Sequence, residues 1–458
     1  MTLWLDVEDI YAYARSSNRL SGIQRLCFEL YAALVEAYPE SVRFLRHSPT
    51  GDHFVVTSWT ELRELFERLA SDTRPPPKTA PIQADEMPLT HGALRRLVAR
   101  IPSEIREPAG QAIRAQLTFL RALLRTGRGV TGVLRRYVQE QVPRGAAGQN
   151  LASPAKPGDM LCVFGSPWFH PDYGSLLRQT KQQLGLDVAL LVYDLIPIMR
   201  PDLVVRSLGE QFLNCYETCL RQASTIFTIS HSTAADITLW AERGGLPLAV
   251  QPQPIPIGTG FTMPEALPDV LPAGLTQGGY VLFVSTIEVR KNHILAFRVW
   301  QKLLQDLPRD QVPQLVFVGR RGWMVADLMQ QIENAQHLSG KLTIIDDAND
   351  ATLAALYQGC RFTLFPSHYE GWGLPVTESL LYGKVCIAAE TSSVPEAGGP
   401  FCLYIDPDNV TAATATIRHA LEDKDLIEAM ERKIKAEFRA TPWSASAEHV
   451  MRALGYAK

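Results

Sequence analysis

Short apolar runs alternate with amphipathic segments along most of the chain. The run at 188–193 is continuously apolar, as in a central strand of a parallel sheet, whereas Leu26, Leu30 and Leu34 mark one face of a helix ending near residue 37. The first half holds further strand candidates at 3–7, 42–46, 54–57, 160–164 and 225–230. The second half holds candidates at 280–285, 315–318, 342–345, 362–365, 385–389 and 402–405. Because these strands alternate with helices, the pattern predicts an α/β fold with two parallel sheets.

Changes of composition predict the domain boundaries. We expect a first domain at 1–261, in which a polar loop follows the first strand. A Pro- and Gly-rich segment without periodicity, 262–279, is the predicted linker to a second domain at 280–440. Residues 441–458 are expected to form a C-terminal helix.

An Arg-rich helical insertion is predicted at about 78–157, inside the first domain. Within it, residues 91–145 hold 11 Arg, three Glu, no Lys and no Asp, a net charge of +8, with apolar residues at helical spacing. This segment can be a helical cap with a solvated basic face. It can also be a surface that docks on anionic lipid headgroups, since each basic residue near such a membrane adds about 1 kcal/mol.

Overall composition restricts the class of protein. A chain of 458 residues with 46% hydrophobic and 20% charged residues is typical of a soluble two-domain protein, and its formal charge of −3 argues against nucleic acid as a partner. The acidic N-terminus differs from a signal peptide, and no apolar run reaches the ~20 residues of a membrane span. We therefore expect a cytoplasmic protein, whose seven scattered cysteines are buried thiols.

The segment with the most chemical information is FTLFPSHYEGWGLPVTESLLYG, at 362–383. Its apolar start predicts a strand, Gly371 and Gly373 predict a loop, and Pro375 and Gly383 mark the start and the end of a short helix. The amides of Gly373, Leu374, Val376 and Thr377 are expected to be unpaired first-turn donors. Such a helix start attracts phosphate.

Two carboxylates flank this helix start. Glu370 lies in the loop before the helix and Glu378 lies about one turn inside it. They can hold a sugar's hydroxyls on one side and a ribose on the other. Taken alone, the same spacing also fits a loop glutamate and a solvated helix glutamate.

The surrounding letters, PSHYEGWGLPVTESLLYGK at 366–384 and SSVPEAGG at 392–399, resemble the donor-site signature of retaining glycosyltransferases of family 4. The resemblance implies the GT-B fold, in which two Rossmann-like domains face a cleft. It implies that the second domain binds the nucleotide sugar, that the first binds the acceptor, and that the last helix crosses back to the first domain. The donor-binding residues it implies in this segment are Glu370, Gly371, Gly373, Leu374 and Glu378.

The resemblance extends to the end of the first strand of the second domain, STIEVRKNH at 285–293. Arg290 and Lys291 fall at the start of the next helix, where a guanidinium and an ammonium suit a diphosphate. Two adjacent basic residues alone would more often be a solvated helix start. Many family members carry this Arg earlier, where the chain has Thr286, so Thr286 also belongs to the implied donor site.

Four further candidates lie in loops after strands. Gly22 corresponds to a glycine loop that faces the donor diphosphate, although an ordinary turn glycine fits equally, and Gly319 borders the nucleotide base in relatives. Asp194 and His170 are acceptor-side candidates, because ligands of open α/β sheets gather at the carboxyl ends of strands. Asp194 can instead cap the next turn, and His170 can be a buried loop histidine. Family members often carry His-Asp where this chain has Tyr193 and Asp194.

The reaction implied is metal-independent transfer with retention, without a cofactor. Lys291, Arg290 and the helix-start amides would stabilise the negative charge of the leaving phosphate, with Glu370 and Asp194 completing the catalytic residues. Asp406-Pro407-Asp408 is a D-x-D string in the loop after the last strand, and we expect a turn there rather than a metal site.

The motifs TIE-x-RKN, at 286–292, and DLIPI, at 194–198, are most similar to those of mannosyl- and rhamnosyltransferases of bacterial surface polysaccharides such as lipopolysaccharide. This points to a GDP-mannose-like donor and a saccharide acceptor. If the acceptor is lipid-linked, a peripheral position on the inner face of the cytoplasmic membrane, through residues 91–145, would be useful. The alternatives are a sugar-nucleotide epimerase or a glycogen-synthase-like enzyme of the same fold, and a non-catalytic assembly subunit.

Overall fold

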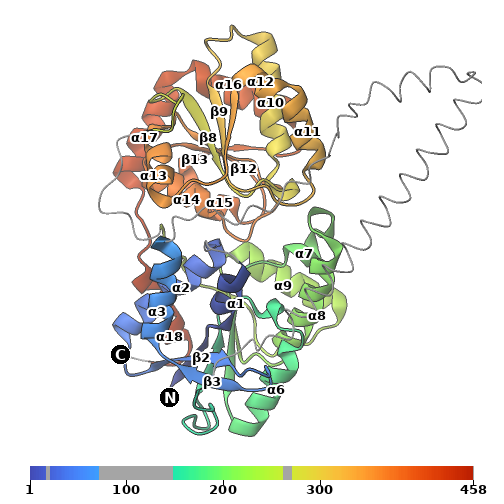
Figure 1. Cartoon of the computed structure of the whole chain (residues 1–458), viewed down its shortest axis with the longest axis vertical. Coiled ribbons are helices and arrows are strands. Elements are labelled where there is room, and N and C mark those ends of the chain that lie inside the picture. Colours follow the sequence, from blue (N-terminus) through green and yellow to red (C-terminus); the bar gives the residue numbers. More distant parts are fainter. Residues whose placement is uncertain (17–20, 72–147, 261–270, 457–458) are drawn as a thin grey trace, which may run out of the picture.

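The computed structural model describes residues 1–16, 21–71, 148–260 and 271–456, which form two α/β domains, one above the other in Figure 1. The predicted Arg-rich helices and their basic surface at 91–145 lie outside the described residues, as does the first half of the predicted linker.

The first domain is built on a seven-stranded sheet of order β3-β2-β1-β4-β5-β6-β7. Neighbouring strands are parallel, except that β3 pairs antiparallel with β2 at one edge. The strands are β1 (Leu3–Asp6), β2 (Val42–His47), β3 (Phe54–Thr57), β4 (Met160–Val163), β5 (Asp187–Val192), β6 (Thr225–Thr228) and β7 (Gln253–Pro254). The helices are α1 (Glu8–Ser16), α2 (Gly22–Ala37), α3 (Trp59–Ser71), α6 (Tyr173–Leu184), α7 (Ile196–Met199), α8 (Arg206–Leu220) and α9 (His231–Gly244).

The second domain is built on a six-stranded parallel sheet of order β10-β9-β8-β11-β12-β13. Its strands are β8 (Tyr280–Val284), β9 (Gln314–Val318), β10 (Leu342–Ile345), β11 (Thr363–Phe365), β12 (Cys386–Ala389) and β13 (Cys402–Ile405). The helical segments are α10 (His293–Asp306), α11 (Ala326–Asn334), the left-handed turn α12 (Gln336–Gly340), α13 (Asp350–Gly359), α14 (Leu374–Leu381), α15 (Val394–Gly398), α16 (Val410–Glu422) and α17 (Lys424–Glu437).

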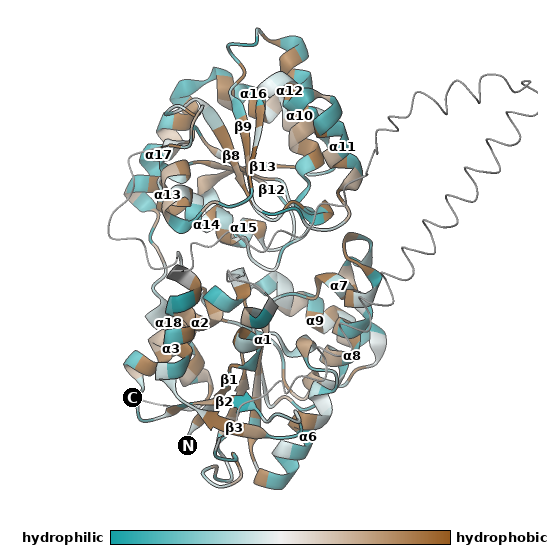
Figure 2. Ribbon diagram, viewed as in Figure 1, coloured by the Kyte–Doolittle hydropathy of each residue, from teal (hydrophilic) through white to brown (hydrophobic). Residues whose placement is uncertain are grey.

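Burial explains why the strands could be recognised from apolar runs. Helices cover both faces of each sheet, and the central strands β1, β4 and β12 are buried along their whole length. Figure 2 shows the same layering, with brown strands inside helices whose outer faces are teal. The predicted α/β fold class with two parallel sheets is therefore confirmed.

The segment after β1, predicted to be a polar loop, is helix α1 instead. Its first residues, Glu8 and Asp9, are only 1% and 5% exposed. Glu8 is paired with Arg46 at 3.0 Å and with Arg15 at 3.0 Å. Burial of Glu8 therefore depends on paired charges, whereas Ile10, 0% exposed, packs into the first domain's core together with Tyr11 and Ala14.

The C-terminal helix α18 (Trp443–Ala453) packs on α2 in the first domain, although the chain reaches it from the second (Figure 1). Ala447, Val450 and Met451 are fully buried in the hydrophobic core that includes Leu26 and Leu30. The last helix therefore adds its apolar face to the core of the other domain.

Two further expectations concern cysteines and membrane spans. All seven cysteines are buried free thiols, as predicted. Among the helices that the structure describes, none combines the length and the apolar character that a bilayer crossing requires.

The packing of α18 can be tested by truncating its most buried long side chain. We expect Met451→Ala to lower the free energy of unfolding by roughly 2–5 kcal/mol in urea denaturation, because the change leaves a cavity in the first domain's core. Met324 is 54% exposed, so Met324→Ala should stay within about 0.5 kcal/mol of the unsubstituted protein. Equal effects of the two substitutions would contradict this packing.

Candidate active site in the interdomain cleft

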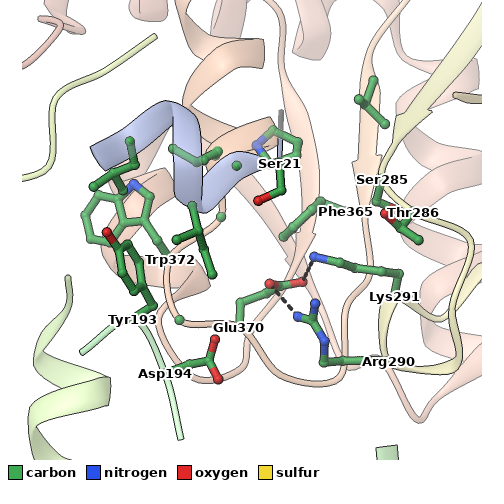
Figure 3. A pocket seen from close by; sticks show the side chains of 18 of the residues that line it. Ser21, Tyr193, Asp194, Ser285, Thr286, Arg290, Lys291, Phe365, Glu370 and Trp372 are labelled. Atoms are coloured by element: carbon green, nitrogen blue, oxygen red, sulfur yellow. Dashed lines mark hydrogen bonds and ion pairs between the residues drawn. The ribbon is translucent and has the colours of Figure 1, made fainter. Parts of the chain in front are cut away.

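A cavity of about 600 Å³ lies between the two domains (Figure 3). The start of α2 and the end of β5 form its wall in the first domain, and the ends of β8 and β11 with the start of α14 form the opposite wall. Ten residues predicted for the site line it: Gly22, Asp194, Thr286, Arg290, Lys291, Glu370, Gly371, Gly373, Leu374 and Glu378.

Glu370 lies at the centre of a buried charge cluster in this cavity, as Figure 3 shows. Its Oε2 accepts a hydrogen bond from Arg290 Nη1 at 2.6 Å, and its Oε1 accepts one from Lys291 Nζ at 2.6 Å. Arg290 also forms an ion pair of 2.7 Å with Glu288, which is 2% exposed. Two cations and two carboxylates therefore balance one another.

The pKa values follow from burial and from these charges. Burial opposes ionisation of Glu370, but Arg290 and Lys291 outweigh it and lower the pKa to about 2. Burial, and then repulsion by Arg290, lower the pKa of Lys291. Burial raises the pKa of Glu288 against the opposing effect of Arg290. Glu370 is thus a permanent anion at neutral pH.

A 3₁₀ turn at Val289–Lys291, rather than the start of α10, positions the two cations. Asn292 ends this turn in the left-handed conformation, with φ of 61°. Its buried Nδ2 donates to the carbonyls of Pro366, at 3.1 Å, and Pro407, at 2.9 Å. Three strand-end loops are thereby fixed to one another, which holds Arg290 and Lys291 opposite Glu370.

The start of α14 faces the same cavity. Gly373 precedes it with φ of 132°, a conformation that favours glycine. Contrary to the prediction of unpaired donors, the amides of Val376 and Thr377 donate to the carbonyl of Gly373, at 2.9 and 3.3 Å. The anion-binding capacity of this helix start therefore rests on the amides of Gly373 and Leu374, which precede Pro375.

Glycines allow close approach across the cleft. A Cβ atom on Gly371 would lie 2.2 Å from the carbonyl oxygen of Tyr193, in the other domain. A Cβ atom on Gly22, the first residue of α2, would lie 3.3 Å from a methyl carbon of Leu374. The starts of α2 and α14 therefore face each other across the cavity.

Asp194 lines the cavity, where a residue on the acceptor side would lie, and its side chain also caps the following turn. Its Oδ1 accepts from the amide of Ile196 at 3.0 Å, while burial raises the pKa of its carboxyl against the charge of Arg290. The preceding Tyr193 turns its hydroxyl inwards, where it contacts the Sγ of Cys27 at 2.9 Å. Tyr193 is a core residue in the position where family members often carry histidine.

Glu378 lies one turn into α14 and is half-buried rather than solvated. The hydroxyl of Tyr357 donates to its Oε2 at 2.7 Å, and burial raises the pKa of its carboxyl. Near it, Arg25 of the first domain forms an ion pair of 2.7 Å with Asp350 of the second. This end of the cavity therefore carries a contact between the two domains.

The structure places Gly319 and His170 apart from the cavity lining. Gly319, with φ of 150°, packs so closely that a Cβ would lie 2.0 Å from the carbonyl oxygen of Ser285. His170 Nε2 contacts the carbonyl of Gly51 at 3.0 Å, and its ring lies 5.2 Å from that of His47. Gly319 lies behind the loop that carries Thr286, and His170 has the position of a partly buried loop histidine.

The D-x-D string forms a turn. The amide of Asp408 donates to Oδ1 of Asp406 at 2.9 Å, and the Oδ1 of Asp408 lies 3.1 Å from Nδ1 of His368. In the ranges that the structure describes, no group of three or more His, Cys, Asp or Glu side chains is arranged to hold a metal ion.

Sequence reasoning missed the residues that hold the Glu370 loop from behind. Ser392 accepts the Glu370 amide on its Oγ at 2.8 Å. The Oγ of Ser393 donates to the carbonyls of Glu370, at 2.8 Å, and Trp372, at 3.0 Å. Both serines belong to the SSVPEAGG motif at 392–399, which carried part of the resemblance. The residue types in this motif do not specify these contacts.

A second cavity, of about 290 Å³, lies in the first domain and shares Ser21 and Ile23 with the interdomain cavity. Its other walls include the aromatic rings of Tyr13, Trp168 and Phe169. This cavity adjoins the cleft and lies between α1, the start of α2 and the segment that follows β4.

Residues 275–437 match the family model of glycosyl transferases, group 1. The chain is 31% identical over 179 residues to the O-antigen chain mannosyltransferase B of Escherichia coli, an alignment that covers 39% of this chain and 46% of the relative. It is 27% identical over 208 residues to the serotype-specific mannosyltransferase WbdA of Escherichia coli, covering 43% and 25%. The chain therefore spans less than half the length of these curated relatives.

Among solved structures, Anabaena Alr3699/HepE, crystallised in complex with UDP, aligns over 100% of both chains with a TM-score of 0.54 and 13% identity. This likeness concerns the fold alone, and it confirms the GT-B architecture. The family match confirms the resemblance that was drawn from the segment at 366–399.

Beside Lys291, the buried His293 offers a test by pH. Burial, and then Lys291, lower its pKa to about 3, so His293 stays neutral in the folded protein but gains a proton below pH ~6.5 when unfolded. Stability is therefore lost as the pH falls. His293→Phe should keep the stacking on Phe283, whose ring centroid is 4.1 Å away, and remove this loss.

In urea denaturation, the unfolding free energy of the variant relative to the unsubstituted protein should rise by about 2 kcal/mol from pH 7 to pH 5. A difference independent of pH would contradict the neutral, buried state of His293.

Proposed function

We propose that this chain, whose residues 275–437 form a glycosyltransferase domain of group 1, transfers a mannosyl group from GDP-mannose or a similar nucleoside diphosphate sugar to a saccharide. The observation that carries the proposal is Glu370 in the loop before α14, held by Arg290 and Lys291 within a cavity of about 600 Å³. Two relatives named as mannosyltransferases support mannose as the sugar, and the name of one of them, an O-antigen chain mannosyltransferase, supports surface polysaccharide as the product.

In this proposal the donor spans the wall formed by the second domain. Its diphosphate lies against Lys291, Arg290 and the amides at the start of α14, where positive charge and a helix dipole coincide. Glu370 accepts hydrogen bonds from the sugar's hydroxyls, and Glu378 accepts them from the ribose. The base extends past Thr286 towards Gly319.

The reaction breaks the bond between the anomeric carbon and the diphosphate oxygen, and the electron pair stays on that oxygen. An acceptor hydroxyl forms the new bond to the anomeric carbon, and its proton passes to the leaving phosphate. Attack from the face of the leaving group retains the anomeric configuration. Lys291 and Arg290 stabilise the charge that develops on the phosphate, and preorganised donors of this kind are worth several kcal/mol.

The acceptor would enter from the first domain. The second cavity, of about 290 Å³, opens beside Ser21 and offers aromatic rings on which a sugar can stack, while Asp194 faces the reacting centre. We include in the proposal a lipid-linked form of this saccharide at the inner face of the cytoplasmic membrane, with residues 91–145 as the surface that contacts anionic lipids.

The diphosphate assignment is tested with Lys291→Ala. We expect release of GDP from GDP-mannose in the presence of a mannose acceptor to fall by at least about 100-fold, because a preorganised charge facing the leaving phosphate is lost. Circular dichroism should still show the folded protein, since Arg290 keeps its pair with Glu370, although the variant should be less stable to urea because one cation of the buried cluster is lost.

The matched control is Lys302→Ala, which removes an equal charge from the exposed face of α10, where Lys302 pairs with Asp306 at 3.3 Å. Its activity should equal that of the unsubstituted protein. Full activity of Lys291→Ala would remove the diphosphate assignment.

Independence of metal is tested by chelation. After dialysis against EDTA, we expect the rate of transfer to stay within about twofold of the untreated rate. The reason is that side chains and helix-start amides stabilise the negative charge of the leaving phosphate. Loss of activity that Mg²⁺ or Mn²⁺ restores would overturn this part of the proposal.

A further inference from the structure

We propose that helix α9 of the first domain clamps the Glu370 loop of the second domain, and that Tyr369, Asp236 and Glu396 are positioning residues for Glu370. The clamp consists of hydrogen bonds between the domains, and these contacts are present whatever reaction the protein catalyses. Their effect on catalysis rests on the proposed function.

The first contact is made at the start of α9. The carboxylate of Glu396, in α15 of the second domain, accepts from the amides of His231 at 2.7 Å and Ser232 at 2.8 Å. Ser230, the N-cap residue, accepts the next amide, that of Thr233, at 3.0 Å. A helix start needs partners for its first amides and favours a negative charge there. The second domain supplies both to a helix of the first.

The second contact is made one turn further along α9. The hydroxyl of Tyr369 lies 2.8 and 3.0 Å from the two carboxylate oxygens of Asp236. Asp236 is 8% exposed, and burial raises the pKa of its carboxyl against the effect of this hydrogen bond. A buried carboxylate has a strong need for such a donor, because water cannot replace it.

Both contacts lead directly to Glu370. Tyr369 is its neighbour in the chain, and the carbonyl of Tyr369 accepts from Arg290 Nη1 at 2.9 Å. Glu396 belongs to the segment whose Ser392 and Ser393 hold the amide and the carbonyl of Glu370. Movement of α9 away from the second domain would therefore release the Glu370 loop on both sides.

The same helix also fixes the opposite wall of the cavity. The Oγ1 of Thr233 donates to the carbonyl of Tyr193 at 3.2 Å, and this carbonyl is the group that Gly371 approaches so closely. One helix thus holds the β5 end with Asp194 and the loop with Glu370. We infer that Glu370 reaches its position in the cavity when the two domains come together.

If α9 clamps the Glu370 loop, breaking the clamp should affect the rate of turnover much more than the affinity for the nucleotide. Arg290 and Lys291, which are proposed to bind the diphosphate, lie on a turn that Asn292 anchors within the second domain, so the position of this turn does not depend on α9. Loss of a clamp contact should therefore lower kcat and leave nucleotide affinity nearly unchanged. A purely structural role would change the melting temperature without this division.

The experiment compares Tyr369→Phe, Glu396→Ala and their combination with the full-length protein. GDP binding is measured by calorimetry, kcat with GDP-mannose and methyl α-D-mannopyranoside as probe acceptor, and the radius of gyration by small-angle X-ray scattering with and without GDP. Each single variant should lose about 10-fold in kcat, as expected for a hydrogen bond to a charged group. The GDP dissociation constant should change by less than about threefold, and the combined variant should have the larger radius of gyration.

Two conservative variants and one control sharpen the result. Asp236→Asn and Glu396→Gln each keep an acceptor oxygen and should show intermediate kcat values. Adding Asp236→Asn to Tyr369→Phe should cause little further loss, because both changes break the same contact. Glu333→Ala removes an exposed carboxylate of α11 and should match the unsubstituted protein.

A radius of gyration equal to that of the unsubstituted protein in the combined variant, or kcat values within about twofold in the single variants, would overturn the clamp. If the unsubstituted protein binds no GDP, the proposed function fails instead. The scattering comparison of the unliganded proteins then still decides whether α9 holds the domains together.

Discussion

Burial of the Glu370 carboxylate between two cations is the interaction on which the cleft depends. Removing one partner from such a buried cluster leaves an uncompensated charge, which costs several kcal/mol. The surrounding loops therefore have to keep Arg290 and Lys291 in place, and they do so through Asn292 and the carbonyls of neighbouring strand ends. The same constraint keeps the guanidinium of Arg290 and the ammonium of Lys291 in place without any ligand, each paired with a carboxylate. A donor diphosphate would meet an arrangement that already exists.

The sequence could predict the framework because the framework depends on apolar burial. Every strand of the second sheet was recognisable as an apolar run, and the repeated βα units predicted that these strands are parallel. The loop at 370–373 and the helix start at Leu374 were recognisable because glycine and proline restrict the backbone in known ways. Their joint position beside Lys291 came from the resemblance and not from any pattern of hydrophobic residues.

The remaining features depend on contacts between polar groups that are distant in sequence. Helix α1 was missed because Glu8 is buried through pairing with Arg46, 38 residues away. The pairing of Asp236 with Tyr369 joins residues 133 positions apart, and neither residue carries a local signal. His170 illustrates the opposite case, since a histidine after a strand was a reasonable acceptor candidate, yet its ring packs beside His47. Tertiary geometry alone decides such cases.

The glycine at 371 has a consequence for anyone who diversifies this pocket. A Cβ atom at this position would lie 2.2 Å from the Tyr193 carbonyl oxygen, so any side chain would force the two domains apart. Randomised libraries aimed at new sugar specificity should therefore leave this position untouched. A substitution there would alter the spacing of the halves, and its effect on the chemistry would be mistaken for altered recognition.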